Sequence, residues 1–192
     1  MALLSKSKRK EYFTYLGLGK YSKKNIRKFQ KIAFPDKPEE WDGSFGPKTD
    51  KALRHWRNVR KYAPSFRPEE FKCGCGGRFC TGYPTQMRVR ELVILQTIYN
   101  HYRKPMTVTS GLRCDRFNAT LRGSSPNSRH KLGKATDFYM SGVTDSVEHR
   151  KKAIRYAKTL TGFRYGYGNG INSYGEKVNA PNMGNALHID CE

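Results

Sequence analysis

Residues 128–137 read SRHKLGKATD, and this stretch decides how the second half of the chain is interpreted. His130 stands at the end of a polar loop, and Asp137 lies in the segment 134–140, whose alternation predicts a β-strand. Gly133 lets the chain turn between them. Imidazole and carboxylate groups are good zinc ligands, so the pair indicates a candidate metal site.

A catalytic zinc ion typically takes three protein ligands and a water, so a third ligand is required. The other histidines of the chain are His55, His101, His149 and His188. His188 lies in an apolar terminal segment, 186–191, that predicts a strand, where an inward polar group needs a partner. On spacing alone, a neighbouring His and Asp are more often ordinary surface polar residues than metal ligands.

The surrounding pattern predicts an α+β fold. Helical spacing of apolar residues predicts helices near 25–32, from Pro47 onward, and over about 85–103 and 144–160. Short strands are expected over 106–109, 134–140 and 186–191, with others joined by turns after Gly162. No segment approaches the run of about 20 apolar residues that spans a bilayer.

Three blocks of residues resemble the M15 zinc peptidases and follow one another along the chain in the order typical of that family. The family includes D-alanyl-D-alanine carboxypeptidases and many phage endolysins. The middle block comprises Ser128, His130, Gly133, Ala135 and Asp137, and the last comprises His188 and Asp190. The first is Ser110-Gly111-Leu112-Arg113-Cys114 with Asn118 behind it, where Leu112 replaces the family's Tyr. The resemblance covers about residues 70–192 and implies a Hedgehog/DD-peptidase-type domain, with a short antiparallel sheet flanked by helices.

The resemblance also implies the roles of the site residues. His130, Asp137 and His188 would bind one catalytic zinc ion, which would activate a water and polarise the scissile carbonyl. Arg113 would hold a substrate carbonyl or carboxylate and help the developing oxyanion, and Ser128 would contribute to substrate binding. Without the motif, Arg113 would be an ordinary surface residue of a basic chain.

The general base is a separate question. Family members place a carboxylate or a histidine shortly before the last ligand, but those positions here hold Asn185 and Ala186. Asp190 lies on the same strand face as His188 and is the predicted base. Two alternatives are a structural role for Asp190, or Asp190 as the ligand with His188 as the base.

The first 62 residues predict a small helical unit. Phe29-Gln30, the DGSFG turn at 42–46 and Trp56 resemble the three-helix peptidoglycan-binding domain, and Phe29, Gln30, Phe45 and Trp56 are the predicted cell-wall-binding residues. Trp56-Arg57 departs from the family's aromatic-Gln. The predicted domains are 1–62 for wall binding, 63–70 as a linker and 71–192 as the zinc peptidase.

Five cysteines occur in the chain, and their odd number argues against a secreted disulfide framework. Cys73, Cys75 and Cys80, with Cys114 as a fourth thiolate, are an alternative structural zinc site. Their spacing is irregular for such a site, so reduced thiols packed in a loop are the favoured interpretation. Cys191 lies apart, near the end of the chain.

Thirty-seven Lys and Arg against sixteen Asp and Glu give a formal net charge of +21. Such a charge attracts polyanions, and anionic wall polymers fit as well as nucleic acid. The basic residues are spread over the chain and no nucleic-acid recognition motif accompanies them, so specific nucleic-acid binding is the weaker hypothesis. A non-catalytic wall-binding protein is the other alternative. The predicted protein is a monomeric endolysin without a signal peptide, held in the host cytoplasm until lysis and then acting on the wall.

Overall fold

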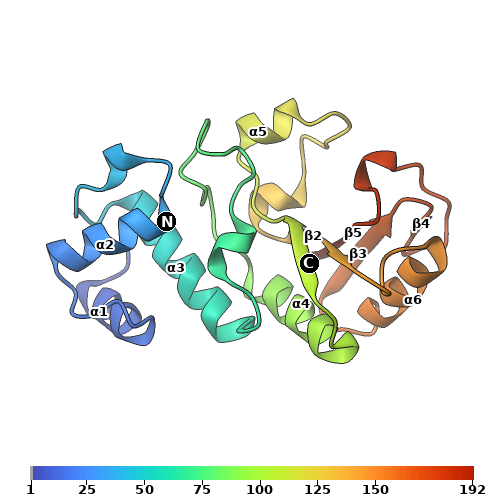
Figure 1. The fold of residues 1–192 in the computed structure, drawn as a ribbon, viewed down its shortest axis with the longest axis horizontal. Helices are drawn as coiled ribbons and strands as arrows, with labels where there is room; N and C mark the ends of the chain where they lie inside the picture. The colour runs from blue at the N-terminus through green and yellow to red at the C-terminus, as the bar shows by residue number, and fades with distance from the viewer. Residues whose placement is uncertain (1) are drawn as a thin grey trace.

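The computed structural model describes residues 2–192 and confirms the α+β class. The described chain begins with helices α1 (Lys6–Tyr15), α2 (Lys23–Ala33) and α3 (Pro47–Tyr62). Further along come α4 (Val89–Tyr102), α5 (Asp115–Thr120) and α6 (Val147–Ala157). The N-terminal helices lie at one end of the molecule and the sheet at the other, with α4 between them (Figure 1). None of the helices within residues 2–192 is long and apolar enough to cross a membrane.

An antiparallel sheet forms the second half of the fold. Its strands are β1 (Met106–Ser110), β2 (Ala135–Met140), β3 (Phe163–Gly168), β4 (Ile171–Asn172) and β5 (Leu187–Cys191). Across the sheet the strand order is β1-β2-β5-β3-β4. The last strand therefore pairs with β2 on one side and β3 on the other, which places Asp137 directly opposite His188.

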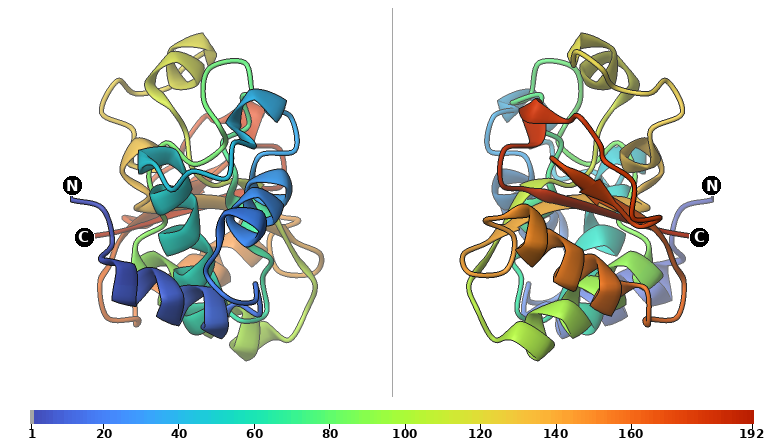
Figure 2. Two further views of the ribbon diagram at one scale, coloured as in Figure 1. Left: turned by 90° about the vertical axis from the view of Figure 1, so that its left-hand side faces the viewer. Right: turned by 90° about the vertical axis from the view of Figure 1, so that its right-hand side faces the viewer.

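The two faces of this sheet have different partners because side chains alternate along a strand. Phe138, Leu187 and Ile189 are fully buried on one face. Figure 2 shows the sheet nearly edge-on, with α4 and α6 on one side and α5 with its neighbouring loops on the other. The apolar face thus packs on two helices, and the opposite face, which carries Asp137 and His188, is left to loops.

The apolar core continues from the N-terminal helices to the sheet. Ala63 and Phe66, in the predicted linker, are buried in it. His55 of α3 crosses the same junction: its Nε2 lies 2.9 Å from the carbonyl oxygen of Pro68, and its Nδ1 accepts a hydrogen bond from the N–H of Met87. The segment 63–70 is therefore packed, and the proposed domain boundaries stay a prediction.

Two local differences from the predicted elements have clear causes. α4 begins at Val89, later than the expected position near Thr85. The N–H of Met87 is engaged by His55, and that of Arg88 donates to the carbonyl of Gly133 at 2.8 Å, so tertiary contacts replace a first helical turn. α5 was not predicted; it is only six residues long and begins after Cys114, whose thiol accepts from the N–H of Phe117.

Candidate metal centre

The three predicted zinc ligands converge on the face of the sheet that is turned away from α4 and α6. His130 belongs to a 3-10 turn, Arg129–Leu132, while Asp137 lies on β2 and His188 on β5. Nε2 of His130 lies 3.3 Å from Oδ1 of Asp137 and 3.3 Å from Nδ1 of His188, and the latter two atoms are 2.7 Å apart. Two nitrogens and one oxygen thus form a compact triangle of buried donors.

This triangle fits a zinc ion. With metal–ligand bonds near 2.0–2.1 Å, tetrahedral coordination separates the ligand atoms by roughly 3.3 Å. The two separations from His130 match this value, and the Asp137–His188 separation of 2.7 Å is that of a hydrogen bond which a shared metal would replace. The remaining ring nitrogens also have suitable partners: Nδ1 of His130 lies 2.7 Å from the carbonyl oxygen of Gly111, and Nε2 of His188 lies 3.4 Å from Oδ2 of Asp190. Such outer contacts fix the tautomer that presents the other nitrogen to a metal.

Burial and charge act on the three ligands in different ways. Burial lowers the pKa of His130 and favours the neutral imidazole. Burial opposes the charge of Asp137, but His130 and His188 outweigh it and hold the carboxyl pKa well below its usual range. Burial would lower the pKa of His188 as well, yet hydrogen bonds to Asp137 and Asp190 raise it to about 9. A metal held by these three residues would take the place of the proton on His188, so its binding would depend on pH.

At the site, four residues on neighbouring strands lie side by side as cross-strand partners. Ser110, Asp137, His188 and Tyr167 are successive partners on β1, β2, β5 and β3. The ring of Tyr167 packs on the His188 imidazole with centroids 4.7 Å apart. Sequence reasoning missed Tyr167, although the alternation of Tyr and Gly over 165–168 was a usable signal, because it gives one face of β3 aromatic rings and the other none.

Arg113 lies beside the ligands, as predicted, but its guanidinium is already engaged. Its Nη2 donates to Oδ2 of Asp137 at 2.6 Å and its Nε donates to Oγ of Ser110 at 2.9 Å. Arg113 therefore orients a ligand, and its predicted contact with substrate stays a prediction. Ser128 immediately precedes the turn of His130, where its carbonyl accepts from the N–H of Lys131 at 3.1 Å; its substrate-binding role also remains untested.

Asp190 lies behind His188, on the ring edge away from the donor triangle. Both of its oxygens accept hydrogen bonds from Arg164, each at 2.6 Å, and the residue is only 2 % exposed. Burial opposes its charge, but His188 and Arg164 lower its pKa. The geometry favours the structural alternative for Asp190 and favours His188, not Asp190, as the ligand. The role of Asp190 as general base stays a prediction.

The predicted wall-binding residues are placed mostly inside the N-terminal helical unit. Phe29 is fully buried and packs edge-to-face on Trp56, which is also buried. Gln30 accepts from the N–H of Gly43 and donates to the side chain of Asp42, so it holds the 42–46 turn. Phe45 is half-buried below the guanidinium of Arg9. Phe29, Gln30 and Trp56 therefore build the unit, and wall binding by this unit remains untested.

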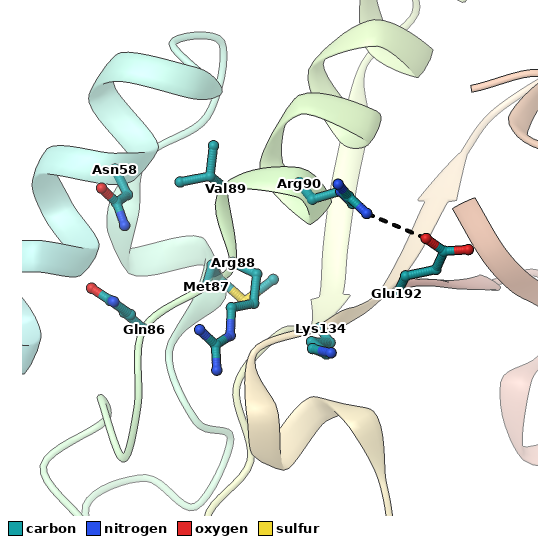
Figure 3. A pocket seen from close by; sticks show the side chains of 8 residues that line it. All are labelled: Asn58, Gln86, Met87, Arg88, Val89, Arg90, Lys134 and Glu192. Atoms are coloured by element: carbon teal, nitrogen blue, oxygen red, sulfur yellow. Dashed lines mark hydrogen bonds and ion pairs between the residues drawn. The ribbon is translucent and has the colours of Figure 1, made fainter. Parts of the chain in front are cut away.

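A cavity separate from the donor triangle lies near the end of the chain. It measures about 460 Å³ and lies at the junction of α3, the start of α4 and the end of the chain (Figure 3). Its lining residues are Asn58, Gln86, Met87, Arg88, Val89, Arg90, Lys134 and Glu192. Arg90 and Glu192 form an ion pair across it at 3.3 Å. None of these residues is a predicted metal ligand.

An antiparallel sheet carrying a buried His–Asp–His cluster defines a candidate metal-dependent hydrolase. Comparison with protein families matches residues 64–172 to the family described as Peptidase M15. More than half of the chain is matched, so this protein belongs to the peptidase M15 family, whose members are metallopeptidases. A comparison with curated proteins found no match. His130 and Asp137 lie inside the matched residues, whereas His188 lies beyond them and joins the site through the pairing of β5 with β2.

Proposed function

We propose that this protein is a zinc-dependent peptidoglycan peptidase that hydrolyses peptide bonds of the wall stem peptide or cross-link. The single observation that carries the proposal is the buried triangle of His130, Asp137 and His188. Its donor atoms lie 2.7–3.3 Å apart, and the outer ring nitrogens have partners. Membership of the M15 family supports peptide hydrolysis. Carboxypeptidase and endopeptidase action both fit this site.

A bound zinc ion would supply a Lewis acid for the scissile carbonyl and a water of lowered pKa. The chain's own groups hold the ligands for that chemistry. The Gly111 carbonyl orients His130, Asp190 orients His188, and Arg113 orients Asp137. Arg113 also carries the positive charge nearest to the ligands on this face, which supports its proposed contact with a substrate carboxylate or oxyanion.

Peptidoglycan is the proposed substrate because two further features support it. The net charge of +21 favours encounter with anionic wall polymers. The N-terminal unit has its Gln30 and its 42–46 turn joined by hydrogen bonds, in keeping with the resemblance to wall-binding domains. Wall anchoring by this unit, a phage endolysin origin and residence in the host cytoplasm before lysis stay predictions.

Purified peptidoglycan sacculi provide the test. The full chain should lower the turbidity of the suspension and release new peptide amino groups, and mass spectrometry of defined muropeptides should identify the bond. A chelator should abolish the reaction and zinc should restore it. His130→Ala is the inactive control. Undiminished hydrolysis after complete metal removal would contradict the proposal, and wall binding without any released amine would support the non-catalytic alternative.

A further inference from the structure

Four cysteine side chains meet between the 73–82 loop and the residue that precedes α5, and none of them belongs to the donor triangle. They are Cys73, Cys75, Cys80 and Cys114, and their four sulfur atoms all lie within 4.8 Å of one another. Cys73 and Cys75 are buried, while Cys80 and Cys114 are half-buried. The spacing in the sequence favoured reduced thiols packed in a loop over a zinc site with Cys114 as its fourth thiolate. The fold brings Cys114, 41 residues beyond Cys73, to the other three thiols.

The cluster has the dimensions of a tetrathiolate metal site. Zinc–sulfur bonds near 2.3 Å place the sulfurs of a tetrahedral site about 3.8 Å apart. The sulfurs of Cys75 and Cys80 are 3.6 Å apart. Disulfides would draw the sulfurs into two pairs near 2.0 Å, whereas here each sulfur is within reach of the other three. A shared central ion accounts for that mutual proximity.

Backbone groups around the cluster are arranged to support thiolates. The N–H of Cys114 donates to the sulfur of Cys73 at 3.3 Å, and the N–H of Gly82 donates to that of Cys80 at 3.4 Å. The N–H of Phe117 donates to the sulfur of Cys114 at 3.4 Å. N–H donors stabilise negative charge on sulfur, so these contacts suit deprotonated ligands.

The loop between the cysteines is shaped to bring them together. Gly76 and Gly77 adopt positive φ angles of 58° and 79°, which let the chain reverse after Cys75 and return with Cys80. The N–H of Cys73 donates to the carbonyl of Gly82 at 2.8 Å and closes the base of the loop. The backbone of one closed loop thus holds three of the thiols together, and the residue that precedes α5 supplies the fourth.

We propose that Cys73, Cys75, Cys80 and Cys114 bind a structural zinc ion, distinct from the ion at His130, Asp137 and His188. Four thiolates complete the tetrahedral shell and leave no position for water, so this ion has no hydrolytic role. A structural zinc ion stabilises the fold that holds its ligands.

The same ion would support the hydrolytic site through one short segment. Cys114 directly follows Arg113, which holds Asp137. Gly111, two residues before Arg113, places its carbonyl oxygen against the ring of His130. Between them, the N–H of Leu112 donates to the carbonyl of Phe71, which lies two residues before Cys73. Fixing Cys114 to the loop therefore fixes both contacts that orient catalytic ligands.

Metal analysis of the full chain, purified under reducing conditions, is the first test and needs no activity assay. The natural chain should hold about two zinc ions, and His130→Ala, Cys80→Ser and Cys114→Ser should each lose about one. Cys191→Ala changes a buried cysteine outside the cluster and should keep both. If Cys80→Ser retains the full zinc content, or if His130→Ala retains none, the structural zinc site is wrong.

The absorption spectrum of the Co²⁺-loaded protein is a second test, which does not require the cysteine variants to fold. Co²⁺ on four thiolates produces intense thiolate-to-metal charge-transfer bands and strong visible bands, which a His–Asp–His site does not. His130→Ala loaded with Co²⁺ should show the full tetrathiolate spectrum. Absence of charge-transfer bands in this variant, or cysteine pairs that stay oxidised under reducing conditions, would overturn the proposal while leaving the peptidase assignment intact.

Discussion

Nδ1 of His188 lies 2.7 Å from Oδ1 of Asp137, although 51 residues separate the two in the chain. The contact exists because β5 enters the sheet beside β2 with these residues as register partners. Replacing His188 with Gln should remove the ion of the donor triangle and lower the rate of wall hydrolysis by several orders of magnitude. Zinc content and amine release measure the two effects. His101→Gln, an exposed histidine of α4, is the matched control, and an active His188→Gln variant would exclude His188 as a ligand.

Replacement of Asp190 separates its proposed positioning role from the role of general base. If Asp190 orients His188, Asp190→Asn should weaken zinc binding by about 10–100-fold, and excess zinc should recover most of kcat. A general base gives another result: full zinc affinity with kcat lowered by about 10²–10⁴-fold. Competition with a chromogenic chelator and the rate at saturating zinc distinguish the two.

Arg113 can be tested in the same manner with a conservative change. Lysine keeps the charge but cannot reach Asp137 and Ser110 with the planar fork that arginine provides. If Arg113 also stabilises the transition state, Arg113→Lys should lower kcat by about 10²–10³-fold even at saturating zinc. Arg116→Lys, an exposed arginine on α5, should leave kcat and zinc affinity unchanged. Full recovery of Arg113→Lys by zinc alone would restrict the residue to orienting Asp137.

A buried carboxyl group on α4 should make stability depend on pH. Glu91 is fully buried, and contacts with the side chains of Thr136 and Cys191 offset only part of the cost of its charge. Burial raises its pKa well above the usual value, so the folded state keeps a proton that the unfolded state loses. This contribution to stability is present below the ordinary carboxyl pKa and is lost as pH rises toward the raised one.

Glu91→Gln should therefore raise the Tm at pH 7 relative to the natural chain and flatten its change between pH 5 and pH 8. Thermal unfolding of zinc-saturated protein provides the measurement. Glu148→Gln, an exposed acid on α6, is the control and should change neither value. A lower Tm for Glu91→Gln at every pH would show that the carboxylate has a stabilising partner.

The glycine of the 128–137 motif has a steric role that a single substitution can reveal. Gly133 has a φ of 66°, and a Cβ atom there would lie 2.2 Å from the carbonyl oxygen of Gln86. Gly133→Ala should destabilise the protein by more than about 1 kcal/mol, because backbone strain and a backbone clash add. Gly142 has a similar φ of 74° with open space around it, so Gly142→Ala isolates the strain alone. Equal denaturant midpoints for the two variants would contradict the clash.

Local pattern was sufficient for much of the fold. Apolar spacing predicted α4 and its buried Leu92 and Leu95, and alternation predicted β2, because these signals depend on residues a few positions apart. His130 and Asp137 could be paired for the same reason, since one short loop-and-strand segment carries both. The M15 resemblance also rested on such short blocks, and the family comparison confirms it for residues 64–172.

Which distant groups meet depends on how the strands pair and the elements pack. The strand order that seats β5 between β2 and β3 brings His188 to Asp137, and no local pattern encodes that order. The partners of the ligands, such as the Gly111 carbonyl and the Arg164–Asp190 pair, follow from the same packing. Long-range packing also brings Cys114 to Cys73, Cys75 and Cys80. Residue types and short-range order define the chemistry that each segment offers. Long-range strand pairing then places those groups in one site, because it joins residues that lie far apart in the chain.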